Sequence, residues 1–69
     1  MTWETLDAIR DHLGYNKTIW ASVLGITPGT YTNWKYNTAW TAHGAVAMIA
    51  RMHEAGIVTI GDMKDVGIL

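Results

Sequence analysis

The sequence predicts an all-α fold, a compact bundle of about five short helices. Apolar residues recur at three- and four-residue intervals in five separate segments, as one buried face of a helix requires. A Thr or Asn suited to capping precedes each segment, and a glycine follows most of them. No segment alternates apolar and polar residues in the manner of a strand, so no sheet is expected.

The capping residues set the expected helix boundaries. The helices are predicted to span residues 3–13, 17–24, 28–36, 42–55 and 60–66. Their expected N-caps are Thr2, Asn16, Thr27, Thr41 and Thr59. The expected stops are Gly14, Gly25, Gly56 and Gly67. Pro28 suits the first position of the third helix, and Thr59 with Asp62 predicts a capping box at the fifth.

Each helix has an apolar face that is expected to turn inward. In the second helix this face comprises Ile19, Trp20, Val23 and Leu24. Tyr31 and Trp34 lie on the inner face of the third helix. The inner stripe of the fourth helix comprises Val46, Ile49, Ala50 and His53.

Length and composition limit the classes of protein that this chain can represent. Its 69 residues predict one domain, residues 1–69, whose stability is modest because a chain this short buries little surface. The sequence has no cysteine, which excludes disulfides and thiolate zinc sites and favours an intracellular protein. No apolar run is long enough to span a bilayer, and no signal peptide is recognised, so no membrane partner is expected.

The formal net charge of −1 argues against a nucleic-acid partner, but the charges are unevenly distributed. All six acidic residues lie near the ends of the chain, and residues 12–53 contain none. This central segment carries Lys17, Lys35 and Arg51. An acid-free centre can approach a polyanion that the net charge of the whole chain would repel.

Small and apolar residues between positions 20 and 34 predict two helices that cross at a steep angle. Ala21 provides a small residue where helix 28–36 would cross helix 17–24, and Gly25 tolerates the positive φ of a three-residue turn. Ile26 is expected to pack the turn against the core. Tyr31 and Trp34 complete the buried contact.

The stretch Ile19-Trp20-Ala21-Ser22-Val23-Leu24-Gly25-Ile26-Thr27-Pro28 resembles the helix-turn-helix DNA-binding proteins, in particular the small five-helix domains of the lambda-type Cro and phage repressor class. The motif covers about residues 17–36, and the five-helix layout extends the lambda repressor-like resemblance to nearly the whole chain. The resemblance implies that helix 28–36 lies in the major groove of operator DNA. Relatives commonly carry several Arg or Gln on this helix, whereas this chain has one Lys there.

The resemblance, combined with helical geometry, implies a set of DNA contacts. The predicted base-contacting positions are Gly29, Thr32, Asn33 and Tyr36. Asn33 is the strongest candidate, because its amide can pair with adenine through two hydrogen bonds. The predicted phosphate contacts are Lys17, Thr18, Thr27, Thr30, Lys35 and Asn37.

Few cations on each protomer imply weak binding by a monomer, so a homodimer on a palindromic operator is expected. The candidates for the dimer contact are apolar residues in excess of what the core can hold: Trp40, Met48, Met52, Ile57 and Leu69. The expected role is transcriptional regulation, with repression as the default, in the cytoplasm of a bacterial host at the nucleoid. The alternative is an antirepressor-like module that binds a protein through the same fold.

An enzyme is the weakest interpretation. No nucleophile–base pair, carboxylate pair, phosphate loop or metal cluster is recognisable, and no deep pocket is expected in a domain this small. None of the three histidines has metal-ligand spacing, and His53 is expected in or near the core. No cofactor, metal or small-molecule substrate is therefore predicted.

Overall fold

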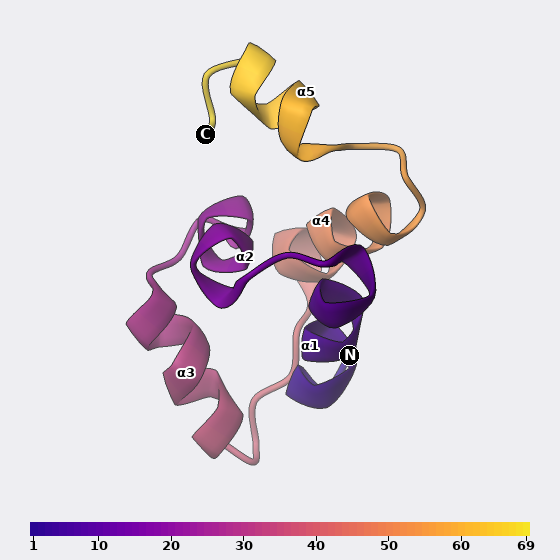
Figure 1. The fold of residues 1–69 in the computed structure, drawn as a ribbon. Coiled ribbons are helices and arrows are strands. Elements are labelled where there is room, and N and C mark those ends of the chain that lie inside the picture. Colours follow the sequence, from indigo (N-terminus) through magenta and orange to yellow (C-terminus); the bar gives the residue numbers. More distant parts are fainter.

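Five helices and their short connections account for the whole chain, and the computed structural model describes all 69 residues (Figure 1). The chain contains no strand. The helices are α1 (Trp3–Leu13), α2 (Lys17–Leu24), α3 (Pro28–Tyr36), α4 (Gly44–Glu54) and α5 (Ile60–Asp65). The all-α prediction is therefore confirmed.

Side-chain caps begin four of the five helices, as the sequence predicts. The hydroxyl of Thr2, the amide oxygen of Asn16 and the hydroxyl of Thr27 each accept a hydrogen bond from a backbone N–H in the first turn of their helix. Thr59 forms a complete capping box with Asp62. A short side-chain acceptor can satisfy N–H groups that the helix itself leaves unpaired.

The predicted start of the fourth helix is wrong. The helix begins at Gly44 rather than residue 42, and His43 replaces Thr41 as the N-cap without a side-chain hydrogen bond. Ala42 explains the difference, because its N–H and C=O both pair with the backbone of Met1, at 2.7 and 2.9 Å. This pairing keeps the segment extended, and Gly44, with φ +56°, turns the chain into the helix. The far ends of α4 and α5 each fall one residue earlier than predicted.

The core lies where α1, α2, α3 and α4 meet. Leu6, Trp20, Ala21, Tyr31 and Ala50 are fully buried there. Ile19, predicted on the inner face, is 39% exposed. The buried face of α2 consists of Trp20, Ala21, Val23 and Leu24, and Ile19 lies about 40° beyond its Val23 edge.

The fifth helix lies apart from the other four. Figure 1 shows α5 at one end of the molecule and α3 toward the other, and the chain is elongated, with extents of 35 × 22 × 22 Å. Met63 is the one residue of α5 that is buried, at 6% exposure. No helix has the length and apolar character that a membrane crossing requires.

Candidate nucleic-acid interface

A three-residue turn joins α2 to α3. Gly25 ends α2 with φ +76°, a left-handed conformation that favours glycine. The N–H of Ile26 donates a 2.9 Å hydrogen bond back to the carbonyl of Ala21, and Thr27 caps α3 directly afterwards. Ala21 itself is fully buried.

Helix α1 supports α3 through the backbone and side chain of Tyr31. The hydroxyl of this fully buried residue donates a 2.8 Å hydrogen bond to a carboxylate oxygen of Asp7. The indole N–H of Trp3 donates to the Tyr31 carbonyl at 3.2 Å, and the two rings lie 5.5 Å apart. These contacts fix the rotation of α3 and therefore decide which of its residues face outward.

Asp7 and Arg10 complete this polar network. The Arg10 guanidinium donates to Asp7 at 2.8 Å and to the carbonyl of Tyr15 at 2.8 Å. Burial raises the pKa of Asp7, but hydrogen bonds from Arg10 and Tyr31, with nearby positive charge, outweigh it and hold the pKa below its ordinary value. Burial, followed by the hydrogen bond to Asp7, raises the pKa of Tyr31. Asp7 is thus a paired carboxylate beneath α3.

The outward face of α3 carries the four predicted base-contacting residues, and all four are exposed: Gly29, Thr32, Asn33 and Tyr36. The Asn33 side chain has no hydrogen-bond partner within the chain, so both its donor and its acceptor remain available. The Thr32 hydroxyl donates to the Pro28 carbonyl at 3.1 Å and can still accept. Tyr36 is 74% exposed.

The predicted phosphate contacts fall into three groups along the α2–α3 pair. Lys17 and Thr18 begin α2, Thr27 and Thr30 lie at the start of α3, and Lys35 and Asn37 lie at its end. All are exposed except Thr30, which is half-buried.

Some of these side chains already make contacts within the chain, but most keep a donor, acceptor or charge that can still be used. The Thr27 and Thr30 hydroxyls are 3.0 Å apart. The ammonium of Lys35 lies 5.7 Å from the ring centres of Trp3 and Tyr36, a cation–π distance. Asn37 accepts from the Ala39 N–H at 3.2 Å, and its NH₂ group remains available.

The predicted dimer residues do not form one uniform set. Met48, Ile57 and Leu69 are exposed, at 59%, 69% and 37%. Trp40 is half-buried and stacks on Trp34, with ring centres 4.2 Å apart, so it already has a role within the chain. Met52 lies in the wall of a pocket between α4 and α5.

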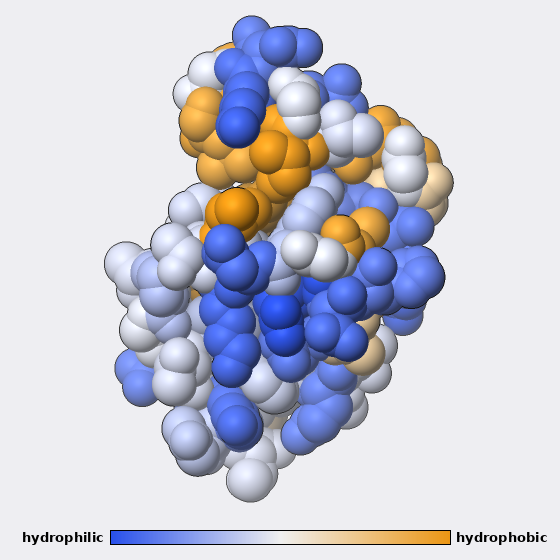
Figure 2. Space-filling view, viewed as in Figure 1, coloured by the Kyte–Doolittle hydropathy of each residue, from blue (hydrophilic) through white to orange (hydrophobic).

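The sequence did not predict this pocket. It has a volume of about 350 Å³, and six of its eight lining residues are hydrophobic. Figure 2 shows hydrophobic residues gathered where α5 meets the rest of the molecule. The apolar spacing of residues 57–68 signals helix packing, but it does not show that a six-residue helix is too short to close the space.

Comparison with known proteins adds no relative. No protein family, curated protein or solved structure matches the chain.

Proposed function

We propose that this chain is a sequence-specific DNA-binding transcriptional regulator, in which α2 and α3 act as a helix-turn-helix and α3 enters the major groove. One observation carries the proposal. A short helix held in place by buried contacts presents an exposed polar face, and its most informative side chain, Asn33, has no partner within the chain. The absence of acidic residues from position 12 to position 53 supports an approach to phosphate.

Each residue on this face has a distinct proposed contact. Asn33 pairs with an adenine edge through two hydrogen bonds. The Thr32 methyl group contacts a thymine methyl, and the Tyr36 hydroxyl donates to a phosphate. Gly29, which lacks a side chain, allows the backbone at the start of α3 to approach the groove.

The small number of cations determines the expected strength of binding. Lys17 and Lys35 are the two cations on the α2–α3 pair. Helix N-termini add backbone N–H donors to phosphate without adding charge. Binding therefore depends on doubling the contacts in a homodimer on a palindromic site, where occupancy of a promoter would repress transcription.

Selection from a random-sequence duplex library at 50 mM KCl, followed by fluorescence anisotropy on the enriched duplex, tests the proposal. The logarithm of the binding constant should change by about −0.9 per phosphate neutralised for each unit of log salt. Removing Lys17 and Lys35 together would remove four phosphate contacts from a dimer. The salt slope should therefore become shallower by about four times 0.9. Lys64→Ala on α5 is the matched control, and it should leave the slope unchanged. Failure to enrich any sequence contradicts the proposal.

A second function, docking onto another protein in the manner of an antirepressor, is favoured by exposed apolar residues outside α3. Met48, Ile57, Val66 and Ile68 are each at least 59% exposed. In this case Lys17→Glu and Lys35→Glu would leave binding to the partner protein intact, while Met48→Asp would abolish that binding. The anisotropy experiment with these three variants distinguishes the two functions.

A further inference from the structure

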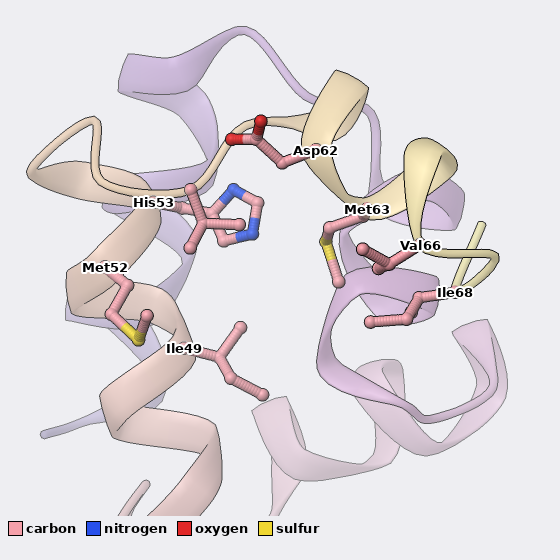
Figure 3. Close-up of a pocket in the computed structure, with 8 residues that line it drawn as sticks. Ile49, Met52, His53, Asp62, Met63, Val66 and Ile68 are labelled. Atoms are coloured by element: carbon pink, nitrogen blue, oxygen red, sulfur yellow. The ribbon is translucent and has the colours of Figure 1, made fainter.

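His53 lies at the junction between α4 and α5 and is almost completely enclosed there. It is 2% exposed, although histidine is usually at least partly solvated. Figure 3 shows its imidazole between the α4 ribbon and Met63 of α5. The rings of Tyr15 and Trp20 meet the imidazole edge-on, with ring centres 5.8 and 6.1 Å away. The junction therefore surrounds a ring that titrates near neutral pH largely with apolar and aromatic groups.

This enclosure suits a neutral imidazole and does not suit an imidazolium. Nδ1 of His53 lies 3.2 Å from the hydroxyl of Tyr15, whereas the buried Nε2 has no hydrogen-bond partner. An imidazolium carries a proton on both ring nitrogens, so Nε2 would become a charged donor without an acceptor. This consequence is the same whichever nitrogen carries the proton of the neutral ring.

The titratable groups around His53 compensate only part of this cost. Tyr15, in the connection between α1 and α2, presents a hydroxyl. On α4 itself, Arg51 and Glu54 are exposed and pair with each other at 2.8 Å. Asp62 of α5 is the charged group that acts on His53, and one of its carboxylate oxygens is already bonded in the capping box. Burial lowers the pKa of His53 below its ordinary value of 6.5, and the Asp62 carboxylate opposes this only in part.

Among the elements around His53, α5 is the one held least firmly. Met63 is its single buried residue, whereas α2 buries four. The connection that carries Tyr15 is fixed by a 2.8 Å hydrogen bond from Arg10 to the Tyr15 carbonyl. Segments with few buried apolar contacts open at the lowest free energy, ahead of the rest of a fold. When the junction has to admit water, α5 is therefore the element that moves.

We propose that protonation of His53 releases α5 from α4 while α1, α2 and α3 stay folded, with residues 55–59 as the hinge. Release hydrates both nitrogens, so the open form takes up a proton that the closed form does not. The opening equilibrium should therefore rise by up to tenfold for each unit that the pH falls below 6.5, until the closed form is itself protonated. The contacts that support α3 lie outside this junction, so the proposal does not depend on DNA binding.

Amide hydrogen exchange of the full ¹⁵N-labelled chain, measured by nuclear magnetic resonance from pH 7 to pH 4.5, tests the proposal. The N–H groups of Met63 and Val66 each donate within or into α5 at 3.2 Å. Their protection factors should fall by up to tenfold per pH unit below 6.5. At every pH they should also be at least about tenfold smaller than those of Leu6 and Tyr31 in the core, because α5 opens before the whole chain unfolds.

Two variants assign the effect to one histidine. His53→Phe should remove the pH dependence of the Met63 and Val66 protection factors. His12→Phe, at an exposed histidine on α1, is the matched control and should retain it. The ring-proton shift of His53 in the unsubstituted chain provides a measurement that needs no variant. Its midpoint should lie below pH 6.5 and coincide with the midpoint of the amide shifts of Met63 and Val66.

Three results would overturn the proposal. The first is protection of Met63 and Val66 that does not change between pH 6.5 and pH 4.5. The second is equal protection of these two amides and that of Leu6, which would make the opening a global unfolding. The third is a His53 midpoint at or above pH 6.5, which would show a hydrated ring in the closed form.

Discussion

The two ends of this small protein differ in how completely their buried polar atoms are hydrogen-bonded. Beneath α3, the hydroxyl of Tyr31, the indole N–H of Trp3 and the guanidinium of Arg10 all donate to close acceptors. Beside α5, the imidazole Nε2 of His53 is unpaired and an apolar hollow remains. A fully bonded support suits a helix that presents side chains in one fixed orientation.

The largest expected contrast comes from truncating one core residue at each end. Leu6→Ala, in the tightly packed part, should lower the free energy of unfolding by about 3–5 kcal/mol. Met63→Ala should cost less, about 2 kcal/mol, because Met63 already borders a hollow and makes fewer contacts to lose. Urea unfolding measures both, and a larger loss for Met63→Ala would reverse the comparison.

Removing one polar group from each end sharpens the comparison. Tyr31→Phe removes a hydrogen bond to a carboxylate and should cost about 1.5–3 kcal/mol. His53→Phe removes one 3.2 Å contact and also one unpaired buried nitrogen, so its net cost should stay below about 1 kcal/mol. Thermal unfolding of the two variants provides the test, and equal destabilisation would show that both ends are equally well bonded.

The two ends should also lose stability in different pH ranges. The folded-state pKa of His53 is below its ordinary value of 6.5, so the unfolded chain takes up a proton first and stability falls as the pH drops below 6.5. The folded-state pKa of Asp7 is below 3.8, so its contribution is retained above that pH and lost as the pH falls further.

Unfolding free energy measured from pH 8 to pH 2 tests this separation. His53→Phe should flatten the upper part of the profile, and Asp7→Asn the lower part. If His53→Phe leaves the slope between pH 6.5 and pH 4 unchanged, His53 is not the buried neutral group described here.

Two glycine substitutions have small expected effects on stability and different expected effects on DNA binding. Gly29 has room for a Cβ, whose nearest neighbour is a Thr27 hydroxyl at 3.9 Å, and Gly29→Ala should stabilise the chain by about 0.5 kcal/mol. The same change should weaken DNA binding, because the added methyl projects from the start of α3. Gly44→Ala should instead cost about 1 kcal/mol through its positive φ, without affecting DNA binding. Calorimetry with anisotropy separates the two effects.

Local patterns in the sequence predict most of the fold. Thr2, Asn16, Thr27 and Thr59 cap helices as expected, since a cap depends on residues within one turn. Thr41 fails as a cap because Ala42 pairs with Met1, a contact between residues that lie far apart in the sequence. The sequence likewise favours an exposed polar face on α3, and the structure shows that face exposed.

The pocket could not be predicted in the same way. The apolar spacing of Ile60, Met63 and Val66 indicates a face that packs against something, but Val66 is 72% exposed. How far α5 covers α4 depends on the course of residues 55–59 and on the shortness of the helix. The partner of the other imidazole nitrogen, Nδ1, is Tyr15, which is remote from His53 in sequence.

The proposed contact of α3 with DNA can be tested by the amide chemical shifts of the ¹⁵N-labelled chain during titration with the selected duplex. The largest changes should occur at Gly29, Thr32, Asn33 and Tyr36, with little change in α5. Asn33→Ala should bind the selected duplex and a scrambled one nearly equally, while Thr38→Ala, at an exposed polar residue beyond α3, should still discriminate between them. Shifts confined to α4 and α5, or full discrimination by Asn33→Ala, would contradict the account.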